Sequence, residues 1–141
     1  MCIRDRLYDL LLANDFAGLE TLFQAFFASI PYEWYTSNDI ANYEGYYASV
    51  FYSYFAGLGL EVVVEDSSSH GRLDMAVRFN DNVYLFEFKV VETAPEGAAM
   101  AQLKEKRYAD KYRALGLPIY LVAVEFSREA RNLAAFEVER A

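Results

Sequence analysis

Cysteine and histidine are almost absent from this 141-residue chain, which contains only Cys2 and His70. A single cysteine excludes an internal disulfide bond and a cysteine-based zinc site. A single histidine excludes a histidine-rich metal centre and argues against a Ser-His-Asp triad. Any chemistry that this chain performs must therefore use carboxylates and lysine.

Long apolar runs are also missing. No run approaches the roughly 18 residues that a membrane-spanning helix needs. The first residues lack the apolar core and the small-residue cleavage site of a signal peptide. We therefore expect a soluble, cytoplasmic protein without a membrane partner.

Positive charge is scarce as well, because 13 lysines and arginines face 21 acidic residues, for a net charge of -8. Nucleic-acid phosphates are bound mainly by lysine and arginine. The composition therefore argues against a free-standing, high-affinity nucleic-acid binder, although it favours solubility.

Apolar and aromatic residues are abundant, at 55% and 17% of the chain, which indicates a packed globular domain. The first six residues, MCIRDR, resemble the translated read-through of a sequencing adapter. We therefore predict that residues 1–6 are not native and that the natural protein continues upstream of Leu7. We expect an N-terminal helix and linker over 7–36 and the main domain over 37–141.

Two stretches before residue 60 have the apolar spacing of helices. The first can be capped by Asn14 or Asp15 and ends at Pro31. The second begins near residues 37–39 and ends at Gly57, and it is aromatic on almost every side. We therefore expect the second helix to be buried from more than one direction.

After residue 59 the pattern changes to that of strands. A hairpin signal stands at Asp81-Asn82, and a helix is expected over 98–115, closed by Gly116. The expected strands are 60–66, 72–80, 83–91, 117–126 and a short edge strand at 134–140. The element order predicts the α/β class, with a mixed sheet covered by helices.

Three charged residues of the hairpin, Asp74, Glu87 and Lys89, lie opposite its apolar face, because side chains alternate along a strand. A two-residue turn at Asp81-Asn82 pairs Asp74 with Lys89, whereas a slip of one step pairs it with Glu87. Either register clusters all three. Adjacent carboxylates repel each other unless a cation lies between them, and such oxygen ligands suit magnesium or manganese.

A solvated face is the alternative interpretation of these charges, and Glu87 with Lys89 would then be a weak pair worth about 0.2 to 1 kcal/mol. The context favours a site. Both residues belong to the most apolar strand pair of the chain, next to Phe86, Phe88 and Val90.

Five segments occur in a characteristic order: NYEGYYASVFYSYF, GRLDMAV, YLFEFKV, AMAQLKEKRYADKY and YLVAVEFS. In this order and spacing the chain resembles the PD-(D/E)XK nuclease superfamily, in the branch found C-terminal to bacterial AAA-ATPase-like domains. The resemblance begins near Asn38 and implies a restriction-endonuclease-like αβββαβ core with an extra N-terminal helix. The proline that gives the superfamily its name is replaced by Leu73.

Carried over to this sequence, the resemblance implies that Asp74 and Glu87 are metal ligands and that Lys89 is the catalytic lysine. Glu44 is similar to an additional glutamate that completes or orients the metal site. Its alternative is a carboxylate that points to water or accepts a hydrogen bond from a nearby tyrosine.

Gln102 matches the glutamine of the family's helix signature, with Lys106 and Tyr108 as its companions. The resemblance therefore includes Gln102 among the catalytic residues. Because Gln102 and Lys106 are four residues apart, they share a helix face, and the alternative is an exposed polar stripe.

The function implied is a bacterial metal-dependent nuclease that uses Mg²⁺ or Mn²⁺, with DNA as the expected nucleic acid. An AAA-ATPase-like domain, missing from this chain, is the expected upstream partner. Many superfamily nucleases act as dimers, so a homodimer is also considered. The alternative function is a non-catalytic interaction module that docks to the ATPase domain, which the acidic charge and surplus aromatic residues favour.

Overall fold

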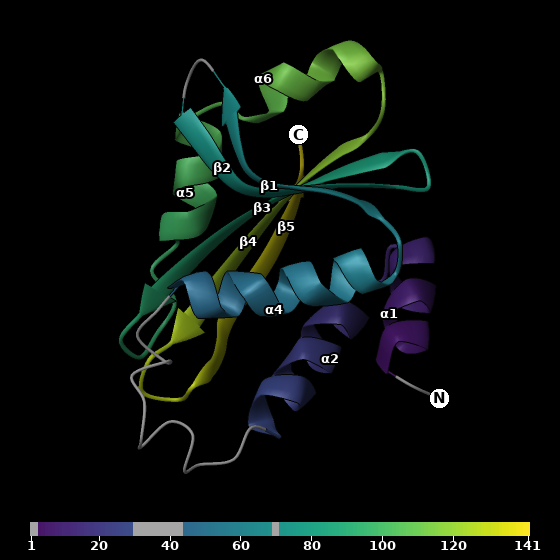
Figure 1. Ribbon diagram of the computed structural model, residues 1–141. Helices are drawn as coiled ribbons and strands as arrows, with labels where there is room; N and C mark the ends of the chain where they lie inside the picture. The colour runs from purple at the N-terminus through teal and green to yellow at the C-terminus, as the bar shows by residue number, and fades with distance from the viewer. Residues whose placement is uncertain (1–2, 30–43, 69–70) are drawn as a thin grey trace.

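The computed structural model describes residues 3–29, 44–68 and 71–141 (Figure 1). The strands form one sheet, and helices cover both of its faces. In chain order the elements are α1 (Ile3–Leu12), α2 (Phe16–Ala28), α4 (Glu44–Gly57), β1 (Glu61–Ser68), β2 (Gly71–Phe79), β3 (Asn82–Val91), α5 (Ala98–Glu105), α6 (Ala109–Tyr112), the 3-10 helix η2 (Arg113–Leu115), β4 (Ile119–Ser127) and β5 (Asn132–Arg140).

The sheet has five strands in the order β1-β2-β3-β4-β5. The pairs β1-β2, β2-β3 and β4-β5 are antiparallel, and β3-β4 is parallel. A parallel pair needs a crossover connection, which α5 and α6 provide. This mixed sheet, consistent with a restriction-endonuclease-like core, confirms the predicted fold class.

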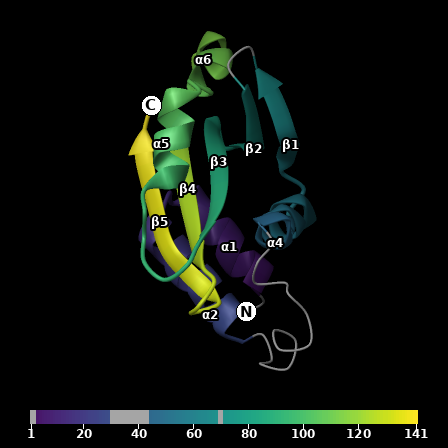
Figure 2. The ribbon, with the colours of Figure 1, turned by 90° about the vertical axis from the view of Figure 1, so that its left-hand side faces the viewer.

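The helices divide between the two faces of the sheet (Figures 1 and 2). Helices α1, α2 and α4 pack on the face that carries Met75, Phe86 and Phe88, which we call the aromatic face. Helices α5 and α6 pack on the opposite face, which carries Glu87 and which we call the carboxylate face. The predicted alternation of the hairpin is therefore confirmed.

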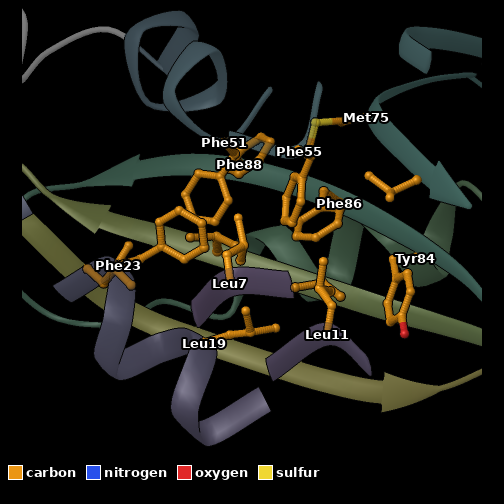
Figure 3. Close-up of a cluster of buried hydrophobic side chains, with 14 of the residues drawn as sticks. Leu7, Leu11, Leu19, Phe23, Phe51, Phe55, Met75, Tyr84, Phe86 and Phe88 are labelled. Carbon is orange, nitrogen blue, oxygen red and sulfur yellow. The ribbon is translucent and has the colours of Figure 1, made fainter. Parts of the chain in front are cut away.

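The aromatic face holds the larger core (Figure 3). Phe51 of α4 is fully buried at its centre. The Phe51 ring stacks on Phe23 of α2 at a centroid distance of 3.9 Å and lies 5.1 Å from Phe88 of β3. The helix predicted to be buried from more than one direction thus packs against both a helix and the sheet.

The N-terminal helices differ in part from the prediction. The α2 helix begins after Asp15, whose side chain accepts a hydrogen bond from the Gly18 N–H at 2.9 Å, so Asp15 is the cap. Ahead of it lies α1, a helix that the sequence analysis did not predict. Leu7 and Leu11 of α1 are buried in the aromatic core. The predicted start of α4 near residue 37 lies outside the described residues.

The hairpin turn lies one residue earlier than predicted. Phe79 pairs with Asn82, so the two turn residues are Asn80 and Asp81, which have φ angles of 52° and 60°. Asparagine and aspartate tolerate this left-handed backbone, and two such residues in succession fit the twist of a two-residue hairpin.

The helix predicted over 98–115 is interrupted. Between α5 and α6 the backbone of Arg107 takes a φ of 53°, which no continuous α-helix allows. The break is followed by Tyr108, which is fully buried in the core of the carboxylate face. The left-handed backbone at Arg107 therefore ends α5 directly before the buried Tyr108. Gly116, at φ 69°, ends the segment as predicted.

None of the helices in the described part of the chain has the length and apolar character that a bilayer crossing requires.

Candidate metal and nuclease site

Strands β2 and β3 part at the predicted site. Their register ends where Met75 pairs with Phe86, one residue short of Asp74 and Glu87. Beyond that point the Phe88 N–H donates to Asp74 Oδ2 at 2.8 Å. The carboxylate thus takes the place of a backbone acceptor, and of the two registers considered, the one that sets Asp74 beside Glu87 is correct.

Glu87 is buried on the carboxylate face, with 2% of its surface exposed. Its Oε1 accepts a hydrogen bond from Gln102 Nε2 of α5 at 2.7 Å. Its Oε2 is also buried and has no hydrogen-bond partner within residues 3–29, 44–68 and 71–141. The solvated-face interpretation is therefore wrong for Glu87, since α5 covers this side of the strand.

The electrostatics of the two carboxylates, Asp74 and Glu87, favour a bound cation. Burial, and then the neighbouring charge of Asp74, raise the pKa of Glu87 from 4.5 to about 8. The positive charges of Lys89 and Lys106 oppose this rise. A divalent cation held by both carboxylates would act in the same direction as the two lysines and favour the ionised form of Glu87.

Lys89 follows Glu87 by two residues on β3, so both side chains leave the strand on the carboxylate face. The Lys89 side chain is partly buried. Its effect on the Glu87 pKa places its charge within electrostatic reach of the carboxylate pair. The structure therefore brings together Asp74, Glu87, Lys89 and Gln102 of the predicted site.

Glu44 is the predicted residue that cannot be placed in this way. It is the first residue of α4, but its side chain lies outside what the structure describes. His70 also lies outside the described residues. Among the described side chains, no group of three or more His, Cys, Asp or Glu residues is gathered as a metal centre.

Sequence reasoning missed Glu125 of β4. Only 2% of its surface is exposed, and its two oxygens accept hydrogen bonds from the backbone N–H groups of Glu96, at 2.7 Å, and Ala99, at 3.2 Å. These groups lie at the start of α5, where N–H donors lack helical partners. Glu125 therefore fixes the helix that carries Gln102. Its only signal in the sequence is a lone carboxylate in an apolar strand.

A family model of the PD-(D/E)XK nuclease superfamily matches residues 42–136. The chain therefore belongs to the PD-(D/E)XK nuclease superfamily, as the sequence analysis predicted.

One curated relative comes from Azotobacter chroococcum mcd 1 and is described as "Uncharacterized protein in vnfD 5'region". It is 69% identical over 134 residues, which make up 95% of this chain and 26% of the relative. The chain therefore spans about a quarter of the length of that protein.

Proposed function

We propose that this chain is a metal-dependent nuclease that hydrolyses phosphodiester bonds in nucleic acid, with DNA as the expected substrate. The observation that carries the proposal is the pairing of two carboxylates, the partly buried Asp74 and the fully buried Glu87. Glu87 Oε2 has no hydrogen-bond partner in the described structure, and a buried carboxylate oxygen without a donor is costly. A divalent cation bound there would remove that cost.

Asp74 and Glu87 are the proposed ligands, and their hard oxygen atoms suit Mg²⁺ or Mn²⁺. Nucleases of this superfamily typically use divalent metals. Glu44 is proposed as a further ligand, from the start of α4. When bound, the cation would supply positive charge that polarises the scissile phosphate.

The protein's own residues would orient the site and stabilise charge. The Phe88 N–H donates to one oxygen of Asp74, and the Gln102 amide donates to one oxygen of Glu87. Both carboxylates are therefore oriented before any ligand binds. Lys89 is proposed to orient the attacking water and to stabilise the negative charge that develops on the phosphate. Gln102 in this scheme positions Glu87, and Glu125 positions α5.

A non-catalytic module that docks to an AAA-ATPase-like domain is the second candidate. Two observations favour it: the net charge of -8, and the relative that is several times longer than this chain. We propose that the longer protein carries the ATPase domain upstream. Removing the module from the full-length relative would test this candidate. A changed ATPase rate, with no cleavage of DNA or RNA by the intact protein, would favour it over the nuclease.

The experiment that tests the nuclease proposal is calorimetric titration of the chain with Mn²⁺. Wild type should bind the ion saturably, whereas Asp74→Ala and Glu87→Ala should not. Asp81→Asn is the matched control, because it removes an exposed acid from the hairpin turn, keeps a residue that tolerates the left-handed backbone there, and should leave binding unchanged. Absence of binding in wild type, or unchanged affinity in both site variants, would contradict the ligand assignment. Labelled DNA and RNA strands incubated with Mn²⁺ then test cleavage.

A further inference from the structure

Positive charge is concentrated in one segment of the chain. Residues 104–113 contain five of the 13 lysines and arginines but only two of the 21 acidic residues. The segment includes the end of α5, all of α6 and the start of η2. The acidity that argues against nucleic-acid binding therefore belongs to the rest of the chain, and this segment has a net positive charge.

The basic segment 104–113 adjoins the carboxylate pair. Helix α5 carries Gln102, which donates to Glu87, and Lys106 lies four residues further along. The Lys106 backbone N–H donates to the Gln102 carbonyl at 3.0 Å, so Lys106 lies one helical turn from the residue that contacts Glu87. The basic segment 104–113 would thus lie beside a substrate phosphate at the carboxylate pair.

A groove of about 220 Å³ lies between strands β1 and β2 and the α6–η2 segment. Ala76 and Arg78 of β2 line one side, and Lys111 and Tyr112 line the other. Ala76 and Arg78 leave β2 on the same side as Asp74, and each step of two residues advances about 7 Å along a strand. The groove therefore follows directly from the carboxylate pair along β2.

We propose that this groove binds the nucleic-acid strand next to the scissile phosphate. Arg78 and Lys111 supply charge for the flanking phosphates, and the partly buried Tyr112, whose ring centroid is 5.8 Å from Lys111 Nζ, forms part of the groove wall. Lys106 directly follows α5, in the segment that joins Gln102 to α6. The inference rests on the proposed nuclease function and adds to it the path of the substrate.

A second groove, of about 380 Å³, lies on the other side of α5 and is also basic. Three of its cations pair with acidic groups. Lys104 pairs with Glu139 at 2.6 Å, and Arg107 and Arg113 both pair with Asp110. In the first groove, Arg78 and Glu61 are 3.8 Å apart, and the pairs of both grooves are exposed, so phosphate can replace any of them at little cost. The grooves differ in position, because Ala76 and Arg78 of the first groove lie on the same side of β2 as Asp74. We therefore assign the substrate to the first groove.

The two grooves provide a matched experiment. One double variant, Arg78→Glu with Lys111→Glu, reverses two charges in the first groove. The control, Lys104→Glu with Arg140→Glu, reverses two charges in the second. Binding of a fluorescein-labelled DNA strand is measured by anisotropy over a salt series in metal-free buffer. Melting temperatures establish that each protein is folded, and Arg78→Gln with Lys111→Gln replaces the first variant if it does not fold.

The first-groove variant should weaken binding at least about tenfold and reduce the slope of log K against log salt by about 1.4, because two phosphate contacts of a single strand are lost. The control should change binding less than about threefold. An equal or larger loss in the control, no loss in the first-groove variant, or no DNA binding by wild type at low salt would each overturn the proposal.

The same proteins separate this inference from the nuclease function. If wild type binds DNA through the first groove but does not cut it with Mn²⁺, the groove assignment stands and the nuclease proposal fails. If the first-groove variant cuts DNA at the wild-type rate and with wild-type affinity, the nuclease proposal stands and the groove assignment fails.

Discussion

The two faces of the sheet are built from different kinds of residue. The aromatic face is filled with large rings, and Phe51 packs against both Phe23 and Phe88. The carboxylate face has a core that includes small residues such as Ala123, and it buries Glu87 and Glu125 as well. One sheet thus combines an apolar layer with a layer that contains buried carboxylates.

This difference assigns most of the stabilising packing to the aromatic face and the candidate site to the carboxylate face. Burying a carboxylate without a full set of partners costs free energy, so a small domain can do so only if other packing compensates. The aromatic face supplies that packing. On the other face, Ala123 lies beside Glu87 in the β3–β4 register and adds little bulk next to the carboxylate. Substitutions on the two faces should therefore change different properties.

The largest expected effect is on catalysis. Lys89→Ala should reduce DNA cleavage by about 10² to 10⁴-fold, because it removes a charge that stabilises the transition state. Mn²⁺ affinity should change little, since lysine is not a ligand. Initial cleavage rates and calorimetry check the two effects, with Lys104→Ala as the control. Loss of Mn²⁺ binding in Lys89→Ala would contradict the role assigned to Lys89.

The next effect is on stability, at the aromatic face. Phe51→Ala should lower the free energy of unfolding by about 3–5 kcal/mol, because it empties a fully buried site. Tyr52→Ala is the matched control, since Tyr52 is the next residue and 42% exposed. Urea denaturation measures both. Similar losses in the two variants would show that the aromatic face does not carry the stability assigned to it.

The pH dependence should come from the carboxylate face. Folding raises the pKa of Glu87 from 4.5 to about 8, so the folded protein binds this proton more tightly than the unfolded chain does. The resulting stabilisation of the native state is complete at pH values below the unfolded pKa of 4.5. That stabilisation is lost as pH rises through the folded pKa. For the metal-free protein the loss between pH 5 and 8 should be about 3 kcal/mol.

Glu87→Gln should flatten this part of the profile, and urea midpoints at several pH values measure it. Saturating Mn²⁺ should also reduce the loss, because ligands bind metal in the ionised form. A wild-type profile with the same slope as Glu87→Gln would rule out Glu87 as its source.

The smallest effect is expected at Glu125. Glu125→Gln replaces one acceptor of the α5 N–H groups with a donor and should cost about 1–3 kcal/mol. Mn²⁺ affinity should also fall modestly, because α5 positions Gln102 and hence Glu87. The exposed Glu129→Gln is the control for both measurements. A stability loss with unchanged Mn²⁺ affinity would leave Glu125 with a structural role alone.

The faces of the hairpin could be predicted because side-chain direction in a strand has a period of two. The register could not, because Asn80, Asp81 and Asn82 all suit a tight turn, and a shift of one residue changes the partner of Asp74. Local preference also failed at Arg107. Arginine is a good helix former, yet the helix breaks there, next to the buried Tyr108.

The role of Glu125 could not be predicted for another reason. Its partners are backbone N–H groups 26 and 29 residues away, at Ala99 and Glu96, and such donors leave no trace in side-chain patterns. Asp74, Glu87, Lys89 and Gln102 could be proposed from the sequence because their side chains form a recognisable motif, and the structure places them together. Contacts from side chain to backbone become visible only when the chain is folded.

The hydrogen bond from the Phe88 N–H to Asp74 makes one amide proton a spectroscopic reporter of the site. The proton is hydrogen-bonded to Asp74, a proposed metal ligand, and Phe88 is itself fully buried in the aromatic core. Its nuclear magnetic resonance frequency should therefore respond when the carboxylate binds a diamagnetic ion such as Mg²⁺. A single backbone resonance would then follow the occupancy of the site without any substrate.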